Sequence, residues 1–156
     1  MSRKRSFISD SVKTDPRYNS EMVGMLISKV MRDGKKRLAQ NICYGALEEA
    51  AKQLNCTPLE ALEKGVEKIR PLLEVKSRRV GGATYQVPVE VSQRRGLVLS
   101  IRWLTDISRS STGRPMKERL AREIVMAAKG EGAAVAKKET MHKMAEANKA
   151  FAYYRW

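Results

Sequence analysis

The sequence contains few of the residues on which metal sites and disulfide scaffolds depend. Of its 156 residues, two are cysteines and one is a histidine. The cysteines, Cys43 and Cys56, lack the C-x-x-C spacing of zinc sites, so the sequence predicts neither a metal centre nor a disulfide framework. Two cysteines without a predicted disulfide are typical of a protein in a reducing compartment. We expect no metal and no cofactor.

Long apolar runs are also missing. The longest, residues 22–27, is interrupted by Gly24 and is too short to cross a bilayer. The basic N-terminus, residues 1–5, is not followed by the apolar stretch of a secretory signal. We therefore expect a single domain of ordinary size that is not exported and makes no membrane contact.

Acidic residues are too few to balance the basic ones. The chain has 31 Lys and Arg against 17 Asp and Glu, a net charge of +14 and a pI near 10.1. Residues 1–37 and 76–119 each hold ten basic residues, whereas residues 38–75 hold four basic and six acidic ones. This distribution predicts a polyanion-binding face built from the N-terminal and central segments, with the acidic block as scaffold.

Helical periodicity recurs along most of the chain. It predicts helices beginning near residues 20, 36, 58, 92, 116 and 133. The third opens with a capping box, Thr57-Pro58-Leu59-Glu60. The second carries the clearest apolar stripe, formed by Leu38, Ile42, Cys43, Ala46, Leu47, Ala50 and Leu54.

Between the third and fourth helices the period changes to two. Alternation on both sides of Gly81-Gly82 predicts a β-hairpin over about 73–91. Pro88 cannot donate to a ladder, so we expect it to face outward on a free-standing ribbon. The fold class is therefore mainly α: six helices in one domain with a protruding two-stranded hairpin.

Two terminal segments flank this domain, which we assign to residues 19–148. Residues 1–18 read as an extended basic arm, because they lack periodicity and contain Pro16. Residues 149–156 form an aromatic and basic tail. From composition, the tail either stacks on exposed bases or docks on the protein.

Several cations are arranged as phosphate contacts would be. Arg95, Arg102 and Arg109 recur every seven residues and share one helix face, a spacing that suits a nucleic-acid backbone. Three cations, residues 35–37, open a helix where they oppose its macrodipole, which suggests function. The polar loop 109–115 suits phosphate in composition but is also what an ordinary interhelical loop contains.

The search for catalytic residues finds none. His142 has no nucleophile or acid pattern around it, so we interpret it as a surface or helix-end histidine and expect no enzyme activity. A rival is an architectural DNA-binding protein with a basic β-arm, although the hairpin tip offers no side chain larger than valine as a wedge. An RNA-modifying enzyme is a second rival, but it would need a cofactor or acid-base constellation.

Three segments together resemble the universal small-subunit ribosomal protein seven family, of the bacterial or organelle-encoded type. They are Leu26-Ile27 with Gly34-Lys35-Lys36, Ile42-Cys43 and Ala46, then the hairpin from Glu74 to Val89, and the ending from His142 to Ala152. The resemblance covers essentially the whole chain. It implies direct binding to the 3′ major domain of 16S rRNA and nucleation of head assembly, without enzyme activity.

The resemblance also implies where contacts fall. RNA-binding positions would be Arg3, Lys4, Arg5, Lys13, Arg17, Lys35, Lys36, Arg37, Lys76, Arg78, Arg79, Arg94, Arg95, Arg102, Arg109, Arg114, Met116 and Arg119. A hairpin and tail surface near the exit-site transfer RNA and the messenger RNA path would use Val80, Gly81, Gly82, Tyr85, Tyr153, Tyr154, Arg155 and Trp156. Small-subunit proteins nine and eleven would be neighbours, in ribosomes of the cytoplasm or of an organelle stroma or matrix. No homo-oligomer is expected.

Overall fold

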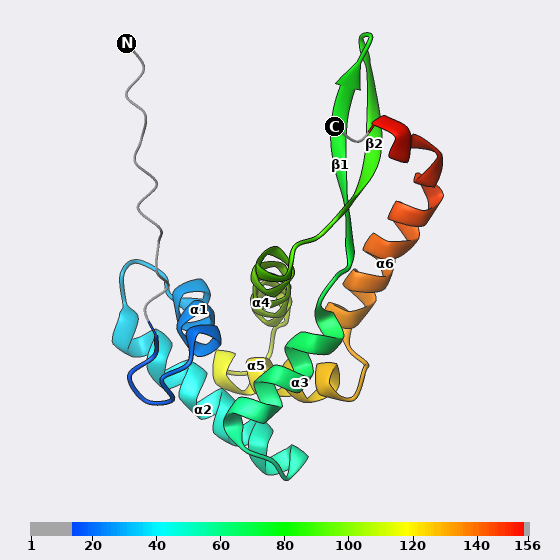
Figure 1. The fold of residues 1–156 in the computed structure, drawn as a ribbon. Helices are drawn as coiled ribbons and strands as arrows, with labels where there is room; N and C mark the ends of the chain where they lie inside the picture. The colour runs from blue at the N-terminus through cyan, green and yellow to red at the C-terminus, as the bar shows by residue number, and fades with distance from the viewer. Residues whose placement is uncertain (1–13, 155–156) are drawn as a thin grey trace, which may run out of the picture.

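The computed structural model describes residues 14–154. Within that range the fold class predicted from the sequence is confirmed: six α-helices, with one antiparallel hairpin between the third and fourth (Figure 1). A 3-10 helix, η1, follows the sixth helix. The elements are α1 (Glu21–Val30), α2 (Lys36–Leu54), α3 (Pro58–Ile69), β1 (Leu73–Val80), β2 (Ala83–Glu90), α4 (Gln93–Ser110), α5 (Met116–Ala128), α6 (Ala133–Ala147) and η1 (Lys149–Tyr154).

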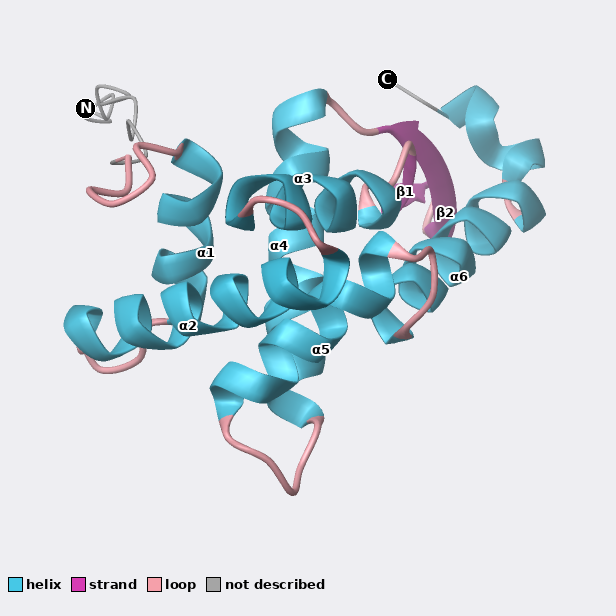
Figure 2. Cartoon of the chain, turned by 90° about the horizontal axis from the view of Figure 1, so that it is seen from below, coloured by secondary structure: helices cyan, strands magenta, loops and turns pink. Residues whose placement is uncertain are grey.

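The core forms where α5 packs against α2, α3 and α4, with α1 lying against α2 and α4. Viewed from below, α1 and the hairpin lie on opposite sides of this helical base (Figure 2). The predicted apolar stripes meet there, with Leu47, Ile69, Leu104 and Ile124 fully buried. Leu38 departs from the predicted stripe: it is 56% exposed in the first turn of α2.

Local signals in the sequence set several helix ends. The Thr57 side chain accepts from the Glu60 N–H, and the Glu60 carboxylate accepts from the Thr57 N–H, so the predicted capping box forms. Ser92 caps α4 with a single hydrogen bond, in which its side chain accepts from the Arg95 N–H. At α2, by contrast, Lys35 is the N-cap residue and provides no side-chain cap.

The hairpin pairs Leu73 with Glu90 and Val80 with Ala83, and it turns through Gly81 and Gly82. Both glycines have positive φ, 58° and 91°, which residues with a side chain rarely adopt. Figure 1 shows the hairpin rising from the helical base with α6 beside it, and α6 contacts both strands.

The prediction that Pro88 faces outward on a free-standing ribbon is wrong. Pro88 is buried, and its neighbour Val87 is completely buried. The reason is tertiary: α6 and η1 pack against the hairpin base, so only its outer half protrudes. A proline is still tolerated, because the sheet has two strands and Pro88 sits in an edge strand.

The end of the predicted N-terminal arm is folded. Residues 16–18 form a turn, and Asp15 is 2% exposed. Its carboxylate accepts from the Arg17 and Tyr18 N–H groups, at 3.0 and 2.9 Å, and from the Tyr44 hydroxyl of α2. Residues 14–18 are therefore fastened to the domain and do not form part of an extended arm as predicted. The rest of the predicted arm, residues 1–13, lies outside the described residues.

The two cysteines are free thiols in different surroundings. Cys43 is fully buried, and this burial raises the pKa of its thiol to about 12. Cys56 is half-buried.

We expect a thiol reagent at neutral pH to label Cys56 in the native protein and to leave Cys43 unlabelled, because the reactive species is the thiolate. Both should react after denaturation in urea. Counting thiols with Ellman's reagent before and after unfolding tests this, and the Cys56→Ser variant should show no fast native reaction. Rapid native labelling of that variant would contradict the burial of Cys43.

In the described part of the chain, every helix is too short or too polar to cross a bilayer.

Candidate nucleic-acid interface

The outer half of the hairpin presents cations on both of its faces. Residues directly across the ladder share a face, so Arg78 lies beside Tyr85, and Arg79 lies beside Thr84 on the opposite face. Both arginines are exposed. The strand therefore projects one guanidinium to each side just below the slender glycine tip.

Lys76, although exposed, has an ion-pair partner within the fold. Its Nζ lies 3.0 Å from the Glu74 carboxylate, which also holds the Arg95 guanidinium of α4 at 3.4 Å. Glu74 is buried, and it joins the base of the hairpin to α4. The sequence did not predict that Glu74 would hold these two cations. The period-2 pattern, which puts residues 74 and 76 on one face, was the available signal.

The tail docks on the protein at its first aromatic residue. The Phe151 and Tyr85 rings are 5.2 Å apart, and η1 packs against β2. This resolves the choice between docking and stacking for Phe151. Tyr153 is 91% exposed. The Tyr154 side chain and residues 155–156, Arg155 and Trp156, lie outside what the structure describes.

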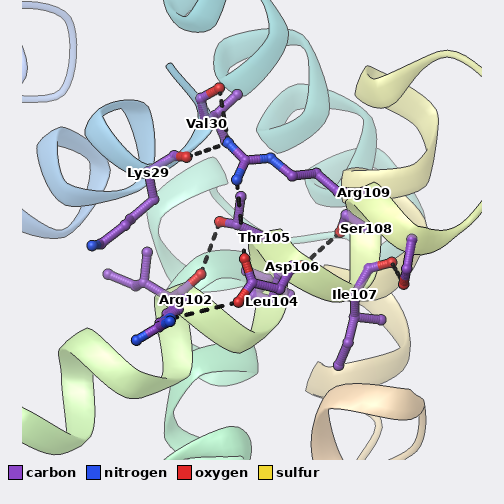
Figure 3. A network of polar contacts seen from close by, with 11 residues as sticks. Lys29, Val30, Arg102, Leu104, Thr105, Asp106, Ile107, Ser108 and Arg109 are labelled. Carbon is purple, nitrogen blue, oxygen red and sulfur yellow. Dashed lines mark hydrogen bonds and ion pairs between the residues drawn. The ribbon is translucent and has the colours of Figure 1, made fainter. Parts of the chain in front are cut away.

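The arginine stripe of α4 divides into two kinds of residue. Arg102 is exposed and pairs with Asp106 at 3.6 Å, one turn away. Arg109 also lies near Asp106, at 4.0 Å, but its guanidinium reaches the end of α1 (Figure 3). Its Nη2 donates to the Lys29 and Val30 carbonyls at 2.5 and 3.3 Å, and its side chain is 28% exposed. Arg109 thus caps the end of α1 within the fold.

Arg119 is also engaged within the fold. Its Nη1 donates to the Arg109 carbonyl at 3.2 Å and to the Ser111 carbonyl, closing the end of α4. Orphan carbonyls at a helix end need such donors. A single sequence pattern does not distinguish arginines of this kind from arginines that face a ligand.

Four predicted residues nevertheless meet in one place. A recess of about 360 Å³ is lined by Lys35 at the N-cap of α2, Arg109 of α4, and Met116 and Arg119 of α5, with the exposed Leu38 beside them. The remaining described candidates are exposed on α2, on α4 and in the loop before α5; they are Lys36, Arg37, Arg94 and Arg114.

The Arg17 side chain is held on α2. It pairs with Glu48 at 2.6 Å and lies over the Tyr18 and Tyr44 rings at 5.4 and 5.1 Å. An ion pair and two ring contacts therefore hold the Arg17 side chain in place. The other predicted RNA-binding residues of the N-terminal arm, Arg3, Lys4, Arg5 and Lys13, lie outside the described residues.

The structure gives His142 a structural partner. Its Nε2 accepts from the Leu72 N–H at 3.0 Å, which ties α6 to the link between α3 and β1. Burial, and next the positive charge of Lys138, lower the pKa of His142. It is partly buried in mid-helix, so the predicted surface or helix-end placement is wrong. Residues 14–154 contain no cluster of His, Cys, Asp and Glu suited to a metal ion.

We expect Arg109→Ala to lower the free energy of unfolding by about 1.5–3 kcal/mol, because it removes charge-assisted hydrogen bonds from two carbonyls at the end of α1. Arg102→Ala should change it by less than about 0.5 kcal/mol, because its ion pair is exposed. Urea denaturation of both variants compares them. Equal losses would contradict the division of the α4 stripe.

The comparisons with known proteins agree on one family. The family model described as "Ribosomal protein S7p/S5e" matches residues 2–149. The chain is similar to the "Small ribosomal subunit protein uS7" of Dictyoglomus thermophilum, with 53% identity over 156 residues and 100% of both chains covered. It is similar to the protein of that name from Thermoanaerobacter pseudethanolicus, with 54% identity over 100% of both. It is also similar to that from Thermotoga neapolitana, with 50% identity over 154 residues and 99% of both.

Proposed function

Because the chain belongs to the ribosomal protein S7p/S5e family, we propose that it binds the 3′ major domain of 16S rRNA directly and nucleates assembly of the head of the small subunit. It is a structural protein of the small ribosomal subunit and not an enzyme. It therefore works in the ribosome, with RNA as its main partner and translation as the process it serves.

The observation that best supports this proposal is the hairpin with its exposed arginines. Arg78 and Arg79 point to opposite faces of a ribbon whose base is fixed by Glu74, α6 and η1. A rigid base with a slender cationic end suits insertion between RNA helices. Because A-form grooves admit side chains poorly, recognition would rest on phosphates and on the shape of a junction.

The proposal also names the molecules that would lie beside this protein in the small subunit. The hairpin tip, residues 80–82, and the exposed Tyr153 would lie near the exit-site transfer RNA and the path of the messenger RNA. Small-subunit proteins nine and eleven would contact the domain. An exposed tyrosine beside a protruding ribbon is the kind of surface such contacts need.

The test is the affinity of the purified protein for the isolated 3′ major domain RNA across a salt series. Duplex DNA of equal length and an unrelated structured RNA serve as competitors. We expect nanomolar binding that both competitors leave largely intact, with the affinity falling as salt rises because counterions are released. Equal, salt-labile binding to all three nucleic acids would contradict the proposal and would leave room for the architectural DNA-binding alternative.

A further inference from the structure

A second recess lies against the N-terminal half of α4, and no pattern in the sequence predicted it. It has a volume of about 510 Å³ and lies between the N-terminal turn, α1, α2 and α4. Pockets that bind small organic groups commonly measure about 300–1,000 Å³. Its apolar lining comes from Met25, Ile27 and Met31 in and after α1, and from Val98 and Ile101 of α4.

Three of the seven polar residues that line this pocket are cations; the others are Thr14, Asp15, Ser28 and Gln40. Lys29, Lys36 and Arg94 line it, each with an exposed side chain, and Gln40 adds an amide. The one acidic residue in the lining is Asp15, and its carboxylate already accepts three hydrogen bonds from the turn and from Tyr44. The pocket therefore has an apolar floor under a positive rim.

We propose that this pocket receives an unstacked nucleobase of the bound RNA; the inference rests on the proposed function and adds a site to it. The base would lie against Met31 and Val98, the apolar lining residues that are partly exposed, and the adjoining phosphates would meet Lys29 and Lys36. Methionine sulfur contacts aromatic rings favourably, and the Gln40 amide offers both a donor and an acceptor to a base edge.

The positive charge of the rim favours a nucleotide over an apolar peptide as the occupant of the pocket. A peptide side chain would cover the floor but supply no anion to Lys29 and Lys36, whereas a nucleotide supplies a flat ring and a phosphate together. Proteins that recognise structured RNA commonly bind bases splayed out of loops and junctions. The chain's net charge of +14 favours the same partner.

The test fills the pocket without changing the charge. In Val98→Trp the indole would occupy the space of the base. We expect affinity for the 3′ major domain RNA to fall about 5- to 150-fold, which corresponds to about 1–3 kcal/mol, with the salt slope unchanged. One base should also lose its protection from base-specific chemical probes, while backbone protections elsewhere persist.

Two further variants keep the test interpretable. Met144→Trp places the same indole at a half-exposed position of α6 outside the pocket. This variant should bind the RNA with the affinity of the wild type. If Val98→Trp does not fold, as judged by circular dichroism, Gln40→Ala leaves the apolar floor intact. It should still weaken protection of the same base.

The possible results distinguish a failure of the pocket proposal from a failure of the proposed function. Wild-type affinity and base protections in both Val98→Trp and Gln40→Ala would overturn the pocket while leaving the proposed function standing. Unchanged RNA protections with altered proteolysis within residues 1–13 would assign the pocket to the chain's own N-terminal segment, which also overturns it. Indiscriminate binding by the wild-type protein would overturn the proposed function, and this inference with it.

Discussion

Replacing Arg78 and Arg79 together by alanine is expected to weaken binding to the 3′ major domain RNA and to make its salt dependence shallower. Both side chains are exposed, and within residues 14–154 neither has a hydrogen-bond or ion-pair partner. Two lost phosphate contacts should reduce the slope of log K against log salt by about 1.4–1.8. Helical content should not change, because neither guanidinium supports the fold.

The hairpin geometry sharpens this expectation. Arg78 shares a face with Tyr85, against which Phe151 packs, and Arg79 lies on the opposite face. The two guanidiniums therefore meet different phosphates, so each single variant should account for about half of the change in slope. Affinities measured over a salt series for the wild type, both single variants and the double variant provide the test.

A charge-matched control is available in the acidic block. Lys52 of α2 and Lys64 of α3 are exposed, and changing both to alanine removes the same two charges. That variant should keep the wild-type slope to within about 0.5, because its lysines lie outside the proposed face. If both double variants flatten the slope equally, the hairpin has no special contact, and only net charge matters.

Features set by neighbouring residues were predictable from the sequence. The capping box at Thr57 needs residues three apart, and the hairpin needs alternation around Gly81-Gly82; both form as predicted. The six helices follow from apolar spacing for the same reason. Each of these signals lies within a window of about twenty residues, the range over which periodicity constrains a chain.

Features that join distant segments were not predictable. Arg109 reaches the Lys29 carbonyl across 80 residues of sequence, and His142 reaches Leu72 across 70. A stripe of arginines on a helix looks the same whether its members face a ligand or cap a neighbouring helix. The burial of Pro88 likewise depends on how α6 and η1 return to the hairpin, which no local pattern specifies.

Asp15→Ala is expected to lower the free energy of unfolding by about 2–4 kcal/mol, a large effect for a polar residue near a chain end. The carboxylate is 2% exposed and accepts from two backbone N–H groups and the Tyr44 hydroxyl. Its removal leaves these donors without an acceptor in a site that water reaches poorly. Urea denaturation measures the loss.

Two companion variants identify the cause. Asp15→Asn keeps one acceptor oxygen and should lose less stability than alanine, whereas Tyr44→Phe removes one of the three donors and should cost about 1–2 kcal/mol. Because Asp15 and Tyr44 contact each other, the double variant Asp15→Ala/Tyr44→Phe should lose less than the sum of its parts. Strictly additive losses would show that the two side chains do not interact.

Alkaline pH examines the same contact without changing Asp15. Desolvation, and next the hydrogen bond to Asp15, raise the pKa of Tyr44 to about 12, against about 10 in an unfolded chain. The folded state therefore favours the neutral phenol. The resulting stabilisation is fully present below pH 10 and is lost as the pH rises from about 10 to about 12, because only the unfolded chain releases this proton readily. Tyr44→Phe should start less stable at neutral pH and lose less over that interval, so the two stability curves should converge. Parallel curves would mean that Tyr44 titrates normally and that the Asp15 contact contributes little to fastening residues 14–18.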